Sequence, residues 1–354
     1  MVPAVMSPSI LPRASLAALA IAVAACSPSS STTDVRATGA STTTGAAGGT
    51  GQGGAAAQGG AGQGGAGHGG AGPGGGAGQG GQAAGHACKE TSFGGERPVK
   101  LHVPPGYQCG TQAPLLFMLH GYASSGAIEE LYFNFAKSAD EKGFLYAHPE
   151  GTKDTQQSQF WNATDACCNF YGSTVDDSAY VLGLIDEIAA EYDVDPKRIY
   201  LFGHSNGAFM AYRMACDHAD RIAAVGGLAG AMFQDVGKCA AKEPVSVLSI
   251  HGTADGTIAY LGGMMGVVPY PSAKQTVEDW ATIDGCSMTP DASAAPKDLD
   301  SMLFGDETTV STYGGCGGGS SVQLWSIFGG AHIPTLSPTF TPSVVDFLLA
   351  QHKP

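Results

Sequence analysis

A serine lies in a short glycine-flanked stretch, "GHSNG" at residues 203–207, between an apolar run and a helical pattern. A strand-to-helix turn of the form G-x-S-x-G exposes the serine hydroxyl, and the N-terminus of the following helix favours developing negative charge. The turn is so sharp that side chains at the two glycine positions would collide with neighbouring elements. We therefore predict that Ser205 is a nucleophile, the alternative being a structural turn.

A serine hydroxyl is hardly ionised at neutral pH, so it needs a base, and the base needs an orienting acid. Chains with this turn carry the acid and then the histidine downstream of the serine. Asp255 in "SIHGTADGTI" and His332 in "IFGGAHIPTL" each follow an apolar run, and we predict that they fill these roles. His251 is expected to shape its loop. Rival acids are Asp235, Asp279 and Asp284, and rival bases are His218 and His352.

Two backbone amides are expected to bind the oxyanion of the reaction. One is the amide of Asn206, which follows the serine, and the other is the amide of Tyr122 in "MLHGYASSG". The alternative for His-Gly-Tyr is a simple turn. Residues expected near the substrate are His120, Gly121, Trp161, Asn162 and His204.

Trp161 lies in a loop, where it is expected either to form a stacking platform for substrate or to be a packed surface aromatic. The segment 261–272 is expected to cover part of the pocket mouth, with Met264 and Met265 as adaptable contacts.

The elements that must position these residues alternate between apolar runs and helical patterns. This alternation predicts one α/β domain whose mostly parallel central sheet carries helices on both faces. The expected strands are 98–104 (edge-type), 114–120, 143–149, 198–203, 222–230, 245–252 and 321–329. Expected helices include 175–194, 207–218 and 341–351.

The first 87 residues differ from the rest in composition. Residues 1–26 read as a signal peptide whose last four residues, "VAAC", are similar to the bacterial lipobox, which predicts a lipid on Cys26; an ordinary signal peptide cut nearby is the alternative. Residues 27–87 are expected to be a disordered Gly-rich linker, because they contain almost no core-forming residue. Residues 88–354 then form the catalytic domain, outside the cell or on its surface, with the outer membrane as the expected anchor.

The formal charge of −14, without clustered Lys or Arg, argues against a nucleic-acid surface. Eight cysteines remain after Cys26, and an even number in an exported chain favours disulfides. No pair has zinc-ligand spacing. The expected pairs are local in the chain, with the adjacent pair the weakest, because a bridge between neighbours is strained. They are Cys88–Cys109, Cys216–Cys239, Cys286–Cys316 and Cys167–Cys168.

Together these motifs resemble the extracellular polyhydroxybutyrate-depolymerase-type esterases, which are grouped with feruloyl and acetylxylan esterases in carbohydrate esterase family one. The matching stretches span about 115–335. They include "LHGYASSG", "HPEGT…WN", "CC…VDDSAYVLGLID", "VDPKRIYLFGHSNGAFMAYRMAC", "HGTADGTIAYLGG" and "GGAHIPT". The resemblance implies an α/β-hydrolase fold, secretion, and Ser205, Asp255 and His332 as a triad. Many relatives have an aromatic residue and then Pro after the histidine, so "GGAHIP" departs from them near the pocket.

The expected activity is hydrolysis of a carboxylic ester through an acyl-enzyme, of polyhydroxybutyrate depolymerase or feruloyl esterase type. The substrate is an ester that can be polymeric, either a polyester or a plant cell-wall polysaccharide ester. No metal or organic cofactor is expected, and the membrane is contacted only through the N-terminal lipid. The alternatives are an acetylxylan-type esterase, a peptidase, or a non-catalytic binding protein on a hydrolase scaffold.

Overall fold

The computed structural model describes residues 86–354, which are built around a nine-stranded sheet of order β1-β2-β4-β3-β7-β8-β9-β13-β12. The strands from β4 to β13 are parallel, and the antiparallel pairs lie at the two edges. This confirms the predicted mostly parallel sheet. The strands are β1 Ser92–Phe93, β2 Val99–His102, β3 Ala113–Leu119, β4 Leu145–Ala147, β7 Val194–His204, β8 Ala224–Leu228, β9 Ser246–Gly252, β12 Thr308–Tyr313 and β13 Val322–Ile327.

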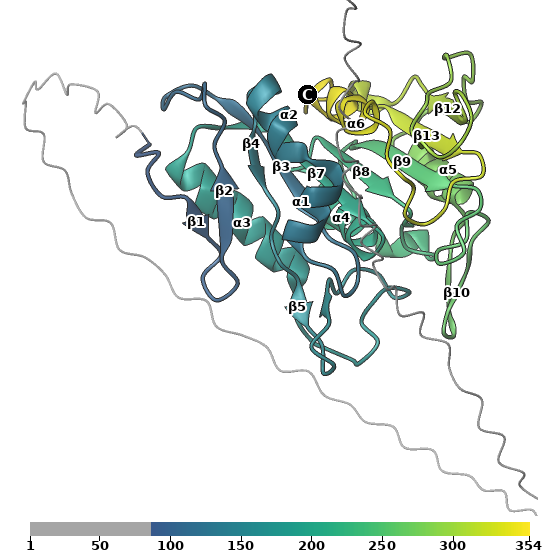
Figure 1. Ribbon diagram of the computed structural model, residues 1–354, viewed down its shortest axis with the longest axis horizontal. Coiled ribbons are helices and arrows are strands. Elements are labelled where there is room, and N and C mark those ends of the chain that lie inside the picture. The colour runs from purple at the N-terminus through teal and green to yellow at the C-terminus, as the bar shows by residue number, and fades with distance from the viewer. Residues whose placement is uncertain (1–85) are drawn as a thin grey trace, which may run out of the picture. The chain divides into compact units, whose positions relative to one another are not determined.

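Helices cover both faces of the sheet (Figure 1). Buried side chains of three helices share one core cluster with the sheet: α3 Asp177–Glu191, α4 Asn206–Asp217 and α5 Ala273–Ile283. The other face is covered by α1 Gly126–Phe133, α2 Phe135–Lys142 and α6 Phe340–Leu349. The result is the predicted three-layer arrangement with helices on both sides of the sheet.

The continuous apolar sequence of β3 follows from its place inside the sheet. Leu115, Phe117 and Leu119 point into the core shared with α4, whereas Leu116 and Met118 point into the core shared with α6. Because successive side chains of a strand alternate between faces, a strand covered on both sides must be apolar at every position.

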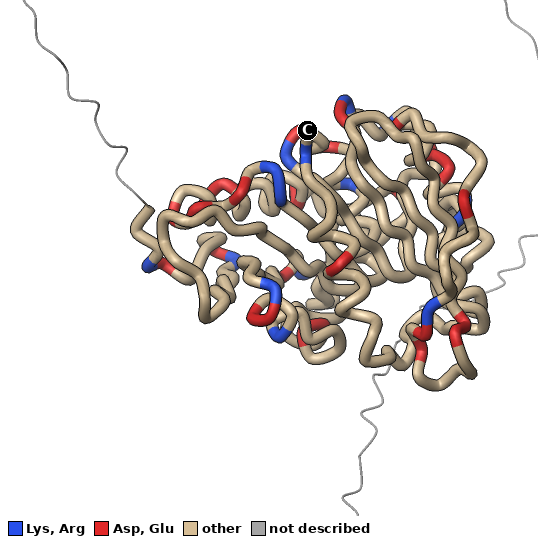
Figure 2. Tube along the Cα trace, turned by 90° about the horizontal axis from the view of Figure 1, so that it is seen from above, with Lys and Arg blue, Asp and Glu red and all other residues tan. Residues whose placement is uncertain are grey.

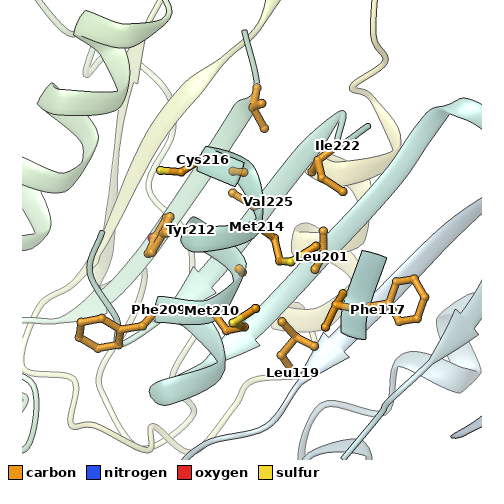
Figure 3. Close-up of a cluster of buried hydrophobic side chains, with 14 of the residues drawn as sticks. Phe117, Leu119, Leu201, Phe209, Met210, Tyr212, Met214, Cys216, Ile222 and Val225 are labelled. Carbon is orange, nitrogen blue, oxygen red and sulfur yellow. The ribbon is translucent and has the colours of Figure 1, made fainter. Parts of the chain in front are cut away.

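Helix α4 follows the serine directly, so its packing fixes the direction in which the chain leaves the turn. Met210 and Met214 of this helix lie against Leu119 of β3 and Leu201 of β7 (Figure 3). This interface is made of fully buried side chains. The apolar face of α4 therefore anchors the residues around Ser205 to the centre of the sheet.

Several elements differ from the sequence prediction. β7 begins at Val194, because Val194 pairs with Ala113 of β3, and α3 accordingly ends at Glu191. β2 is covered by β1 and is not the outermost strand. β12 was not predicted, since its burial pattern is that of a half-exposed edge strand with polar residues. The remaining short elements are β5 Thr152–Lys153, β6 Gln159–Phe160, β10 Gly263–Met265, β11 Val268–Tyr270 and the 3-10 turns Val236–Lys238 and Gly317–Gly319.

Four disulfides join the eight cysteines of the domain, in the pairs expected from their order in the chain. They are Cys88–Cys109, Cys167–Cys168, Cys216–Cys239 and Cys286–Cys316. Cys216 lies in the last turn of α4, so its bridge fastens the helix that follows the serine to the segment before β9.

The predicted signal peptide, Cys26 and all of the predicted linker except its last two residues lie outside the described residues. Within residues 86–354, no helix has both the length and the hydrophobicity needed to cross a bilayer. In the same part of the chain, Lys and Arg are scattered among acidic residues (Figure 2). Examples are the ion pairs Lys142–Asp346 and Arg221–Asp186.

Candidate active site

The functional candidates gather at the carboxyl ends of the parallel strands. From β3 the chain passes to β4 on one side of the sheet and later returns to β7 on the other side. Loops diverge at such a switch in strand order, which is where open α/β sheets bind ligands. Tyr122 follows β3 and Ser205 follows β7, while Asp255 follows β9 and His332 follows β13.

The turn at Ser205 has the geometry that its two glycines suggest. A Cβ atom on Gly203 would lie 2.1 Å from the carbonyl oxygen of Gly207, and one on Gly207 would lie 1.9 Å from the carbonyl oxygen of Leu119. Ser205 itself has φ 52° and ψ −119°, a region that residues with a side chain rarely adopt. Backbone packing on both sides therefore holds the serine in a strained conformation.

This strain predicts an unusual stability difference between two variants that both lack the hydroxyl. Ser205→Gly removes the steric cost of the backbone conformation, whereas Ser205→Ala retains it. After allowance for the greater entropy of unfolded glycine, we expect Ser205→Gly to be more stable by about 1 kcal/mol. Urea unfolding of the two variants measures the difference, and equal or reversed midpoints would show that the turn is not strained.

Three side chains form a hydrogen-bonded chain at this end of the sheet. Ser205 Oγ lies 3.0 Å from His332 Nε2, and His332 Nδ1 lies 2.8 Å from Asp255 Oδ2. A carboxylate accepts only, so Nδ1 carries the proton and Nε2 is free to accept one from the serine. The arrangement can move a proton from a hydroxyl to an imidazole.

The Asp255 carboxylate is buried and accepts four hydrogen bonds or close polar contacts. The amides of Thr257 and Ile258 donate to Oδ1, and His251 Nε2 lies 3.3 Å from Oδ2 beside the contact from His332. Burial by itself raises the pKa of Asp255, but the donors from His251 and His332 outweigh burial and hold this pKa below its ordinary value. Asp255 is therefore an anion at neutral pH.

His332 is held ready to accept a proton. Burial lowers the pKa of its imidazole, the hydrogen bond to Asp255 opposes this effect, and the nearby His204 lowers the pKa further. The net shift is downward from the ordinary value, so the ring is neutral at neutral pH. A neutral imidazole is the form that can act as a general base.

Two backbone amides next to the serine have no acceptor within the described part of the chain. Among residues 86–354, neither the N–H of Tyr122 nor that of Asn206 is in hydrogen-bond geometry with a backbone or side-chain acceptor. The loop that carries Tyr122 approaches the serine closely, since a Cβ atom on Gly121 would lie 3.4 Å from Ser205 Cβ. These free donors have the chemistry needed to bind an oxyanion.

The expectation that Trp161 stacks on a substrate is wrong, because its side chain is completely buried. The indole N–H donates to the carbonyl oxygen of His120, and the Trp161 backbone exchanges two hydrogen bonds with the Asn206 side chain. The amide side chain of Asn162 is likewise occupied, because it donates to the Val175 carbonyl oxygen. Trp161 therefore ties the loop that carries Tyr122 to the first residue of α4.

Three other predicted substrate contacts are also buried. His120 accepts the N–H of Gly151 at Nε2 and donates from Nδ1 to the carbonyl oxygen of Gly121, which leaves neither ring nitrogen free. Gly121 and His204 are buried as well. These three residues shape the loops around the serine and present no side chain to a substrate.

The rival acids and bases lie elsewhere. Asp279 pairs with Gln275 within α5, and Asp235 caps the turn Val236–Lys238. His218 ends α4 and contacts Ser178. Asp284 ends α5, where burial raises the pKa of its carboxyl to about 6. His352 is exposed beyond α6.

Apolar side chains are exposed on two loops, one of which contacts Tyr122. Phe170 packs edge-on against the Tyr122 ring at 5.1 Å between centroids and is half exposed. The β10–β11 hairpin, which comes soon after Asp255, projects from the domain (Figure 1). Leu261 is 85% and Val267 is 88% exposed there, whereas Met265 packs against the core.

Comparison with known proteins identifies the family of this domain. The family model described as "Esterase PHB depolymerase" matches residues 98–302, which is more than half of the chain. The chain belongs to this esterase family. The family assignment agrees with the resemblance inferred from the motifs.

Relatives of this chain include "Feruloyl esterase B" of Piromyces equi, which is 30% identical over 67% of this chain and 42% of the relative. "Putative esterase NocK" of Nocardia uniformis subsp. tsuyamanensis is 27% identical over 71% of this chain and 75% of the relative. The chain thus spans less than half of the first relative's length.

The solved structure "Acetyl xylan esterase from Aspergillus awamori" matches 72% of this chain and 94% of its own, with a TM-score of 0.52 and 14% identity. At that identity the likeness shows the α/β-hydrolase fold alone.

Glu129 is the residue at this site that sequence reasoning missed. It lies in the first turn of α1, where an acidic residue normally interacts with the helix dipole in solvent. Its carboxylate is buried and reaches His204 and the amide of Gly121. Nothing in "GAIEELYF" distinguishes this acid from its neighbour Glu130.

Proposed function

We propose that this esterase hydrolyses carboxylic esters through Ser205, His332 and Asp255 as nucleophile, base and orienting acid. The observation that carries the proposal is the hydrogen-bonded chain of these three side chains, with the serine held in a strained turn at the end of β7. A structural serine needs neither the strain nor a neutral imidazole beside its hydroxyl.

In this mechanism Ser205 Oγ attacks the ester carbonyl carbon while His332 Nε2 takes the hydroxyl proton. The amides of Tyr122 and Asn206 bind the oxyanion that forms. The C–O bond to the alcohol then breaks, and His332 gives its proton to the leaving alcohol. Water, deprotonated by His332, cleaves the acyl-enzyme, which releases the acid and restores the serine.

Asp255 remains ionised throughout this cycle. Its contact with Nδ1 fixes the tautomer of His332 and stabilises the imidazolium that forms after proton transfer. The amides of Thr257 and Ile258 and the imidazole of His251 keep the carboxylate oriented.

We infer that the substrate has a bulky apolar part, of the feruloyl or polyhydroxybutyrate type. Phe170 packs against Tyr122, and Leu261, Met264 and Val267 are exposed around the β10–β11 hairpin that follows Asp255 in the chain, so two loops offer apolar surface. Such side chains suit an aromatic acyl group or a polyester chain.

The enzyme is further proposed to act outside the cell, attached to a membrane through a lipid on Cys26 and the Gly-rich segment up to residue 87. The sequence "VAAC" before the linker and the disulfides of the domain support this location. A tether of this kind suits work on a polymer that cannot enter the cell.

The test of the proposed activity is a turnover screen of the full-length, oxidised protein. The substrates are p-nitrophenyl acetate, methyl ferulate, amorphous polyhydroxybutyrate and acetylated xylan, with Ser205→Ala as the control. We expect turnover of p-nitrophenyl acetate and a higher kcat/KM or degradation rate on methyl ferulate or the polyester than on acetylated xylan. A folded protein inactive on all four would contradict the proposal and favour a binding protein on a hydrolase scaffold.

A further inference from the structure

A buried pair of ionisable side chains lies directly behind the serine, outside the proposed triad. Glu129 of α1 and His204, the last residue of β7, are each 4% exposed, and the carboxylate lies 3.3 Å from His204 Nδ1. Acidic side chains are almost never buried to this extent unless they are paired. The pair lies next to Ser205, so its role at the site needs an explanation.

The contacts of His204 define its charge. Nδ1 faces the Glu129 carboxylate, and Nε2 lies 3.2 Å from the carbonyl oxygen of His332. Both partners can only accept hydrogen bonds, so both ring nitrogens must carry protons. Burial opposes this charge, but Glu129 outweighs burial and raises the pKa of His204 above its ordinary value. The pair is therefore an imidazolium and a carboxylate.

The same two residues touch two loops of the site. Glu129 Oε1 accepts the N–H of Gly121 at 3.2 Å, in the loop that presents the Tyr122 amide. His204 reaches the backbone of His332. A second residue of α1, Tyr132, donates its hydroxyl to the carbonyl oxygen of Pro334 in the same loop as His332. Helix α1 thus holds both loops.

The sheet by itself does not fix these two loops to each other. The loop with Tyr122 follows β3, and the loop with His332 follows β13, and three strands lie between them in the sheet. No ladder hydrogen bond can therefore set the distance from the oxyanion donor to the base. The path through Glu129 and His204 passes next to Ser205 and joins the two loops directly.

We propose that Glu129 and His204 are positioning residues that act as one unit, holding the oxyanion-binding amide of Tyr122 and the imidazole of His332 in place around Ser205. The inference rests on the proposed triad. A buried ion pair is often no more stabilising than an apolar pair of the same size, so stability alone does not explain its presence. Misplacement of catalytic groups by about 1 Å, in contrast, costs about 100-fold in rate.

The charge of His204 has a second consequence for His332. The two rings lie 5.3 Å apart between centroids, and the cation disfavours protonation of His332. The ionisable groups around the two rings are Glu129 and Tyr132 of α1, Asp255 and His251. His204 therefore helps His332 to remain a neutral base as the pH falls.

The experiment compares Glu129→Gln, His204→Gln and the double variant in the full-length protein. Titration with a p-nitrophenyl phosphonate counts reactive sites, so that kcat for p-nitrophenyl acetate refers to folded molecules. We expect each single variant to lose about 10- to 100-fold in kcat with KM changed by less than about two-fold. The double variant should lose no more than the worse single one, because the residues act as a unit.

The pH profile distinguishes a positioning role from a purely structural one, because a purely structural role would leave the profile unchanged. Without an anionic partner the buried His204 becomes neutral, and the pKa of His332 then rises. The acid limb of kcat/KM should therefore move to higher pH in Glu129→Gln and His204→Gln. Glu130→Gln is the matched control, because this carboxylate lies on the same helix but bonds to Tyr146 and Ala136. We expect Glu130→Gln to keep the wild-type kcat and profile.

Three outcomes would overturn the proposal. Unchanged kcat per titrated site together with an unchanged acid limb in Glu129→Gln would reduce the pair to a structural contact. Losses that multiply in the double variant would show that the two residues act separately. If Ser205→Ala, measured in parallel, keeps wild-type turnover, the triad itself fails and the inference falls with it; loss of turnover in that variant separates the two cases.

Discussion

Replacing Ser205 by Ala removes nearly all esterase turnover and leaves the fold intact. In the proposed mechanism the acyl-enzyme forms on this hydroxyl, and we expect kcat/KM for p-nitrophenyl acetate to fall by about 10⁴- to 10⁶-fold. The buried neighbours of Ser205 do not depend on its hydroxyl, whose hydrogen bond is to His332. Steady-state kinetics measure the loss, and near-ultraviolet circular dichroism with a thermal melt tests the fold.

Residual activity would be informative in this variant. The oxyanion binding proposed for the amides of Tyr122 and Asn206 does not need the serine, so slow turnover above the uncatalysed rate is compatible with the mechanism. Retention of more than about one-tenth of wild-type activity in a folded protein is not compatible with a serine nucleophile, and it would point to another group.

Replacing Asp255 by Asn is the second change with a large expected effect. The neutral amide cannot stabilise the imidazolium of His332, and its NH₂ group favours the tautomer with the proton on Nε2, where it blocks the serine. We expect kcat to fall by about 10³- to 10⁴-fold. Kinetics with p-nitrophenyl acetate, at several pH values above neutrality, measure the effect.

The matched control for this change is Asp279→Asn, in which a carboxylate on α5 is replaced by the same amide. Asp279 bonds only to Gln275 of its own helix among the described side chains, and we expect wild-type kinetics. An active Asp255→Asn variant, or an inactive Asp279→Asn variant, would mean that the orienting acid has been assigned to the wrong residue.

The strand ends of the site could be predicted because each is marked in the sequence. Apolar runs precede Ser205, Asp255 and His332, as expected for buried parallel strands, although polar residues interrupt the second and third of them, and each run is followed by a glycine-containing loop. Carboxyl ends of parallel strands share one edge of the sheet, so strand assignment alone brings these residues to the same side. The local order of the cysteines likewise matched the four bridges of the domain.

The buried residues that support the site, in contrast, could not be predicted from the sequence. Trp161 is buried because the Asn206 side chain and the His120 carbonyl oxygen bind its polar groups, and these partners lie 45 and 41 residues away in the sequence. Glu129 is buried because α1 packs over the end of β7 and pairs it with His204, 75 residues away. Periodicity reports which residues share a face of an element, but it carries no information on such long-range polar pairs.

The edge strand of the sheet is a second feature that could not be predicted from the sequence. β12 mixes buried and partly exposed positions, with Thr and Ser among them, so its sequence has no continuous apolar run. Its assignment as a strand depends on pairing with β13 along six residues. An edge strand of this type is defined by its neighbour more than by its own composition.

The most direct test of the central claim is to trap the nucleophile covalently. A p-nitrophenyl phosphonate reacts with an activated serine, releases p-nitrophenol and leaves a stable phosphonyl ester. Peptide mass spectrometry after tryptic digestion then locates the group. The mechanism predicts one phosphonyl group per active molecule, on Ser205 within the peptide 199–213, formed in proportion to the loss of turnover. Complete loss of turnover with the label on another residue, or with Ser205 unmodified, would contradict it.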